Sequence, residues 1–199
     1  MKLYEKINIS LEQFVVDEIK ECIRNKIIET VPNGWDPGML RQFRLYLGDQ
    51  SSISNTAVIS INKTLTEHNL PTMHNILAFA RTTVKGHNST LHIDENDTTI
   101  FKSSIIFPVE GCENSFMYWA IGSYNSNLTT HPTNGTKYSL LTWNSDVVIL
   151  DELEITTPTV VRVDIPHDAY TNNEWPRIIF SIRLRENLSI EEIMERFKP

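Results

Sequence analysis

The chain has 199 residues, near the length of one ordinary domain, and its 40% hydrophobic and 22% charged residues are the mixture of a globular protein. Its formal net charge of −7 gives little attraction toward phosphate backbones, so we expect no nucleic-acid partner. No apolar run approaches the roughly 20 residues of a membrane helix, and no secretory signal stands at the N-terminus. Two cysteines are too few for a disulfide framework. These observations together predict a cytoplasmic protein that enters no membrane.

The first element expected in chain order is a helix over residues 10–28. Ser10 stands at its N-cap position, and Gln13 stands at the capping-box position. The apolar residues that recur at helical spacing are Leu11, Phe14, Val15, Ile19, Cys22 and Ile23. The turn formers at 32–34 favour an end there, so residues 1–35 are predicted to be N-terminal helical support.

Beyond this helix the apolar runs become short and rich in β-branched and aromatic residues, and turn formers separate them. In chain order they are LRQFRLYL, AVISI, ILAFARTTV, IFKSSIIF, FMYWAI, YSLLTW, DVVIL, TVVRVDI and RIIFSIRL. A closing helix is expected over 188–198, with Ser189 as its N-cap. We therefore predict a single domain over 1–199 that is mainly β with flanking helices, with a jelly-roll core over 40–185.

The segment LHIDENDTT, residues 91–99, carries a histidine and an aspartate two positions apart. On an extended segment such residues point to the same face, so His92 and Asp94 project together and Ile93 turns the other way into packing. An imidazole beside a carboxylate can bind a metal ion as a bidentate pair of ligands. The triplet alone is weak evidence, because it arises by chance and a surface aspartate is usually solvated.

The second half of the chain adds a third candidate ligand. His167 follows a strand-like run, and Arg177 opens another strand ten positions later. Two histidines and one carboxylate form the facial triad of non-heme Fe(II) oxygenases, which leaves three metal positions open. Several strands fit between His92 and His167, so both ends of a jelly roll could meet at one metal.

The last strand, RIIFSIRL, is expected to have two different faces. Period-two alternation places Ile178, Phe180, Ile182 and Leu184 on one face, which suits a core. The other face carries Arg177, Ile179, Ser181 and Arg183, which suits a pocket. A buried carboxylate needs a permanently charged, fork-shaped partner, and a guanidinium supplies one better than an ammonium does.

The H-x-D pair, the distant histidine and the arginine ten residues later resemble the pattern of the Fe(II)/2-oxoglutarate-dependent dioxygenases. The resemblance covers roughly residues 76–185, and HID followed by SIIFPVEGCENSFMYW is similar to small members that hydroxylate amino acids or peptides. It implies a double-stranded β-helix, which is a distorted jelly roll. It also implies Fe(II), 2-oxoglutarate and O2 as cofactor and co-substrates, with succinate and CO2 released as a C–H bond is hydroxylated.

Carried over residue by residue, the resemblance makes His92, Asp94 and His167 the metal ligands, and Arg177 the anchor for the far carboxylate of 2-oxoglutarate. The family often has a hydroxyl residue two positions after that arginine, where this chain has Ile179. The second contact to the co-substrate is therefore expected from elsewhere. The candidates, on strands after the H-x-D pair, are Tyr118, Ser104 and Lys102.

Two alternatives of other classes stay open at this point. One is a cupin-type jelly-roll metalloprotein without 2-oxoglutarate, although cupins usually bring more histidines in their first motif. The other is a non-catalytic jelly-roll binding module. The substrate is equally open between an amino acid, a peptide and a small metabolite, and the oligomeric state is not indicated.

The polar segment GSYNSNLTTHPTNGTK, residues 122–137, is longer than the usual strand connection. Long loops on a rigid β scaffold often carry binding residues. We expect it to form part of a substrate lid, with Tyr124 and His131 as contacts. An exposed hairpin without function is the alternative.

Overall fold

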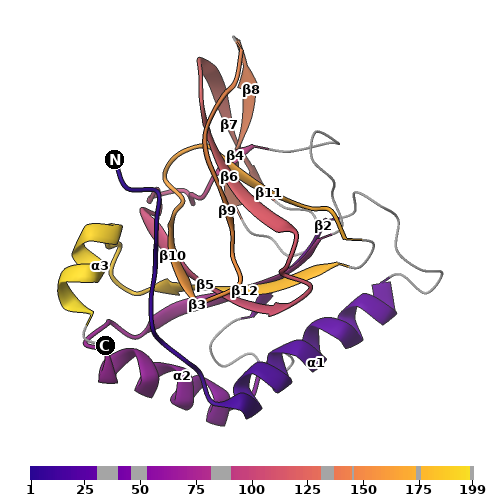
Figure 1. Cartoon of the computed structure of the whole chain (residues 1–199), viewed down its shortest axis with the longest axis vertical. Helices are drawn as coiled ribbons and strands as arrows, with labels where there is room; N and C mark the ends of the chain where they lie inside the picture. The colour runs from indigo at the N-terminus through magenta and orange to yellow at the C-terminus, as the bar shows by residue number, and fades with distance from the viewer. Residues whose placement is uncertain are drawn as a thin grey trace.

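The computed structural model describes residues 1–30, 40–45, 53–81, 91–130, 137–144, 146–173 and 176–197, with the backbone alone for 27, 28, 30, 40–45, 79 and 81. Within these ranges lie twelve strands and three helices (Figure 1). No helix in the described ranges combines the length and the apolar character needed to cross a membrane.

Six antiparallel strands form the first sheet, in the order β1-β10-β5-β12-β3-β2. Their bounds are β1 Tyr4–Lys6, β2 Leu40–Leu45, β3 Met73–Arg81, β5 Ser103–Glu110, β10 Thr159–Arg162 and β12 Arg177–Leu184. The strand β12 lies between β5 and β3, with Ser181 opposite Ile106 on one side and Leu77 on the other. The predicted pocket strand is therefore central in its sheet.

Six further antiparallel strands form the second sheet, in the order β7-β8-β4-β11-β6-β9. Their bounds are β4 His92–Ile93, β6 Ser115–Ile121, β7 Tyr124–Thr130, β8 Lys137–Trp143, β9 Val148–Glu154 and β11 His167–Thr171. The strand β11 pairs with β4 on one side and β6 on the other, so His167 lies opposite both His92 and Trp119.

The chain passes back and forth between the two sheets. The strands β3, β4, β5 and β6 alternate between the first sheet and the second, and β9, β10, β11 and β12 alternate again. This alternation is that of a jelly roll, and the predicted class, mainly β with flanking helices, is confirmed.

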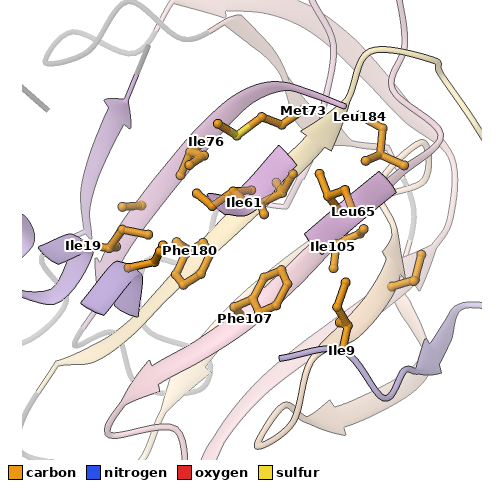
Figure 2. Packing of buried hydrophobic residues seen from close by; sticks show 14 of the residues in the cluster. Ile9, Ile19, Ile61, Leu65, Met73, Ile76, Ile105, Phe107, Phe180 and Leu184 are labelled. Atoms are coloured by element: carbon orange, nitrogen blue, oxygen red, sulfur yellow. The ribbon is translucent and has the colours of Figure 1, made fainter. Parts of the chain in front are cut away.

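The helices α1 (Gln13–Thr30) and α2 (Asn55–Glu67) cover the outer face of the first sheet, and α3 (Ile190–Arg196) lies at its side (Figure 1). Beneath them, Ile19 of α1 and Ile61 of α2 pack with Phe180 of β12 in one buried cluster (Figure 2). Phe180 stacks on Phe107 of β5, with ring centroids 4.9 Å apart. Helices and sheet thus share one hydrophobic core.

The two faces of β12 differ as the alternation predicts. Phe180 and the other even-numbered residues of the strand belong to the core under the helices. Ile179 points the opposite way, into a second apolar cluster with Trp119 of β6 and Val161 of β10. The odd-numbered face of β12 therefore lines the interior between the two sheets.

One strand prediction and the start of one predicted helix need correction, and the start of the closing helix is confirmed. AVISI, expected as a strand, lies inside α2, which Ser54 caps by accepting a hydrogen bond from the Ala57 N–H. The first helix begins at Gln13, and Gln13 Nε2 donates to Asp17 Oδ1 instead of completing a box with Ser10. The closing helix begins as predicted, with a complete capping box between Ser189 and Glu192.

The described part of the segment 122–137, which is expected to be a loop, is largely strand. Residues 124–130 form β7, which pairs along its whole length with β8, and the hairpin projects from the second sheet (Figure 1). His131, one of the two predicted lid contacts, lies outside the described residues. Tyr124 packs edge-on against Trp143, with ring centroids 5.3 Å apart.

Candidate metal centre

The strand pairing of β4 with β11 brings the two candidate histidines together. His92 and His167 are direct partners in the register, and their ring centroids lie 4.5 Å apart. Ile93 between the two H-x-D residues turns away and is buried in an apolar cluster on the other face of the second sheet, with Tyr118 and Leu141. The predicted alternation of this triplet is confirmed.

Asp94 follows directly after β4 and completes the group. One ligand atom from each of His92, Asp94 and His167 can be chosen such that all three lie within 4.8 Å of one another. The His92 Nε2 atom is 3.6 Å from Asp94 Oδ1. The Asp94 backbone is fixed on both sides, because its N–H donates to the Val163 carbonyl and its own carbonyl accepts from the Phe101 N–H.

The buried imidazole of His167 is held in one orientation. Its Nδ1 lies 2.9 Å from the carbonyl oxygen of Ile165, and because a carbonyl only accepts, Nδ1 carries the proton and Nε2 keeps its lone pair. Burial, with a smaller effect of His92, lowers the pKa of His167 to about 4. The ring is therefore neutral at pH 7, as a metal ligand must be.

Asp94 stays ionised although it is partly buried. Burial alone would raise its pKa, but the guanidinium of Arg183 and the two neighbouring histidines outweigh burial, and the pKa lies below its usual value. Arg183 Nη2 is 2.6 Å from Asp94 Oδ2. The guanidinium of Arg183 also lies over the ring of Phe101, 4.1 Å from the ring centroid. A carboxylate and two imidazoles with these charges can hold a divalent cation.

One predicted co-substrate residue, Ser104, lies in the interior between the sheets, together with other buried polar side chains. Ser104 on β5 is buried, its hydroxyl is paired with that of Ser181 on β12, and it donates to the Ile182 carbonyl at 3.0 Å. Asn75 on β3, opposite Arg183 in the register, is also buried. These side chains form a polar layer between the sheets.

Arg177, the predicted anchor, is buried on the same inner face of β12 but at the other end of the strand from Arg183. Six residues of β-strand separate the two Cα atoms by roughly 20 Å. Cys112 lies beside Arg177, and burial raises the pKa of its thiol although the guanidinium acts in the opposite direction. Arg177 is thus an interior cation, placed at a distance from the arginine that contacts Asp94.

The other two predicted co-substrate residues point elsewhere. Tyr118 lies in the apolar cluster on the face of the second sheet where Ile93 packs, and its hydroxyl is 3.5 Å from Asp168 Oδ2. Lys102 is exposed, and its ammonium lies 3.3 Å from Glu192 Oε2 on α3. Neither position supports a contact with a molecule bound at the triad.

The hairpin β7–β8 contributes residues that were not singled out from the sequence. Leu140 of β8 pairs with His92 in the register, and the Tyr138 ring meets the His92 ring edge-on at 5.7 Å between centroids. Lys137 Nζ lies 2.6 Å from Asp97 Oδ1. The hairpin is therefore joined to the segment that carries His92 and Asp94. The sequence signal for this placement is the short run YSLLTW, which is expected to form a strand.

No protein-family model matches the sequence, and no curated protein matches it. Among solved structures, the X-ray structure of E. coli ycfD is similar over 98% of this chain and 52% of that chain, with a TM-score of 0.45 and 12% sequence identity. This chain therefore spans about half the length of that protein. Likeness at this level carries no argument about activity, so the function must be argued from the site.

Proposed function

We propose that this protein is an Fe(II)- and 2-oxoglutarate-dependent oxygenase that hydroxylates a C–H bond of an amino acid, a peptide or a small metabolite. The observation that supports this most is the triad of His92, Asp94 and His167, whose ligand atoms lie within 4.8 Å of one another inside a jelly roll. Two imidazoles and one carboxylate suit Fe(II) and leave three coordination positions for other ligands.

The chain's own residues fit a divalent ion. His167 offers Nε2 because its Nδ1–H donates to the Ile165 carbonyl, an outer hydrogen bond that is usual for metal-bound histidine. Asp94 is ionised and is held by Arg183 and by its backbone hydrogen bonds. A site whose ligands are already deprotonated and oriented needs little rearrangement to bind metal.

The interior also offers groups for a dicarboxylate. Ser104 and Ser181 supply hydroxyls in the polar layer, and Arg183 and Arg177 supply positive charge on the inner face of β12. Trp119 is fully buried opposite His167 in the register. It belongs with Ile179 to the apolar cluster between the sheets. When bound, Fe(II) and 2-oxoglutarate supply the oxidative decarboxylation that activates O2 for attack on a C–H bond.

An anaerobic spectrum tests this proposal. Adding Fe(II) and 2-oxoglutarate to the protein should produce a weak visible charge-transfer band that neither component gives alone. His92→Ala should abolish the band, because two ligands do not hold the ion. The matched control is His74→Ala, since His74 is an exposed histidine outside the triad. Absence of the band from the unchanged protein would contradict the proposal.

The same experiment separates the alternatives. A cupin-type metalloprotein would bind Fe(II) through the triad and give no band with 2-oxoglutarate. A non-catalytic module would bind neither, and equilibrium dialysis with Fe(II) under argon distinguishes these two outcomes.

A further inference from the structure

The carboxylate of Asp94 has two different environments, one for each oxygen. Oδ2 lies 2.6 Å from Arg183 Nη2, whereas Oδ1 faces the histidines, 3.6 Å from His92 Nε2. Arg183 is buried, and its guanidinium rests on the ring of Phe101. The carboxylate therefore turns one oxygen toward the candidate metal position and the other toward a fixed cation.

The charges in this group have a consequence for metal binding. Two imidazoles, which bind a metal only in their neutral form, together with one carboxylate and one guanidinium carry no net charge. A divalent ion therefore leaves two uncompensated positive charges in a partly buried site, which is costly. A dianion bound beside the metal cancels both charges, and a monoanion cancels only one.

We infer that Arg183 is a positioning residue that presents Asp94 through Oδ1 alone and makes tight metal binding depend on a dianionic co-ligand. The inference rests on the proposed function, because it assumes that the triad binds a divalent metal. It goes further by stating that the metal and a dianion bind cooperatively at this site. Removing the Arg183 charge should strengthen binding of the metal alone and weaken this cooperativity.

Mn(II) is the probe, because it is stable in air and supports no turnover. Its affinity is measured at pH 8 by the electron paramagnetic resonance signal of the free ion. Each titration is done with metal alone, with dianionic 2-oxoglutarate, and with monoanionic 2-oxobutyrate. The variants are Arg183→Met, Arg183→Lys and, as a matched control, Arg185→Met, which removes the same charge from an exposed position in the same region.

For Arg183→Met we expect Mn(II) alone to bind at least about tenfold more tightly than to the unchanged protein. The advantage of 2-oxoglutarate over 2-oxobutyrate should fall by at least about tenfold. Arg183→Lys and Arg185→Met should both behave like the unchanged protein, since the first keeps the buried charge and the second leaves Asp94 untouched. If Arg183→Met does not fold, Arg183→Gln replaces it, because an amide can still donate to Oδ2 without charge.

Unchanged or weaker binding of Mn(II) alone to the uncharged variants would overturn the inference. A role for Arg183 in gripping 2-oxoglutarate only would alter the dianion titrations and leave the affinity for metal alone unchanged, which would overturn it too. Failure of Mn(II) to bind the unchanged protein even in the presence of 2-oxoglutarate would instead refute the metal site of the proposed function. The two failures are therefore distinguishable.

Discussion

The metal-free protein should lose stability between pH 6.5 and pH 4 because of His167. Burial lowers the pKa of this histidine from 6.5 to about 4. Above pH 6.5 it is neutral in both the folded and the unfolded chain, and the shift has no effect. As the pH falls below 6.5 the unfolded chain takes up a proton that the folded chain takes up only near pH 4, so the free energy of unfolding decreases.

The size of this loss follows from the shift. One pKa unit corresponds to about 1.4 kcal/mol, so between pH 7.5 and pH 4.5 the contribution of His167 falls by about 2.5 kcal/mol. His167→Gln removes the titrating group and should show a correspondingly smaller decrease over the same interval. His74→Gln, at an exposed histidine, should retain the full decrease.

The assay is urea unfolding of chelator-treated protein at the two pH values, followed by far-ultraviolet circular dichroism. The quantity compared is the change in unfolding free energy between pH 7.5 and 4.5, so a general destabilisation by the substitution cancels. An equal pH dependence in His167→Gln and the unchanged protein would refute the reasoning that His167 is buried in its neutral form.

Three further predictions concern the co-substrate, the core and the hairpin. Arg177→Ala should keep Fe(II) binding and raise the 2-oxoglutarate concentration needed for half-saturation, since losing one partner of a buried charge pair costs about 2–5 kcal/mol. Arg177→Lys should recover only part of the lost affinity for 2-oxoglutarate. If Arg177→Ala needs no more 2-oxoglutarate than the unchanged protein, the anchor moves to Arg183. Phe180→Ala should lower the free energy of unfolding by about 3–5 kcal/mol in chemical denaturation, because it empties the core between β12 and the helices; a loss under about 1 kcal/mol would contradict that packing. Replacing residues 125–134 by a Gly-Ser link should preserve 2-oxoglutarate binding and uncoupled succinate formation while substrate-stimulated turnover falls; full coupled activity would leave the lid without support.

The parts of the fold that were predictable from sequence are those where a short-range pattern decides the structure. The alternation in RIIFSIRL separates Phe180 from Ile179, and hydrophobic burial places one under the helices and the other between the sheets. The H-x-D triplet behaves likewise, because Ile93 packs in an apolar cluster on the face away from His92 and Asp94. The capping box at Ser189 is a local interaction that needs no tertiary context.

The prediction of a strand at AVISI is wrong because β-branched residues favour a strand by propensity although they lie in α2. Ala57, Ile61 and Leu65 recur at a spacing of four, are fully buried, and follow the cap at Ser54. This periodicity, extended beyond the five letters AVISI, is the signal that would have identified the helix. Tertiary burial on one face then outweighs the strand propensity of the isoleucines.

The contact between Arg183 and Asp94 could not be derived from sequence. It joins residues on different sheets, and nothing local distinguishes Arg183 from Arg177 on the same face of β12. The sequence predicted which face carries the arginines, whereas the pairing of strands decides which arginine meets the carboxylate. The position of Lys102 could not be derived from sequence either, because its partner is Glu192 on α3, outside the interior between the two sheets.

Release of labelled CO2 from 1-labelled 2-oxoglutarate tests whether the triad of His92, Asp94 and His167 performs 2-oxoglutarate-dependent oxidation. With Fe(II), ascorbate and O2, the unchanged protein should release labelled CO2 and form succinate in equal amounts, even without its substrate. His167→Ala should lose this reaction, while His74→Ala retains it. Decarboxylation that persists in His167→Ala, or that is absent from the iron-loaded unchanged protein, would contradict the claim.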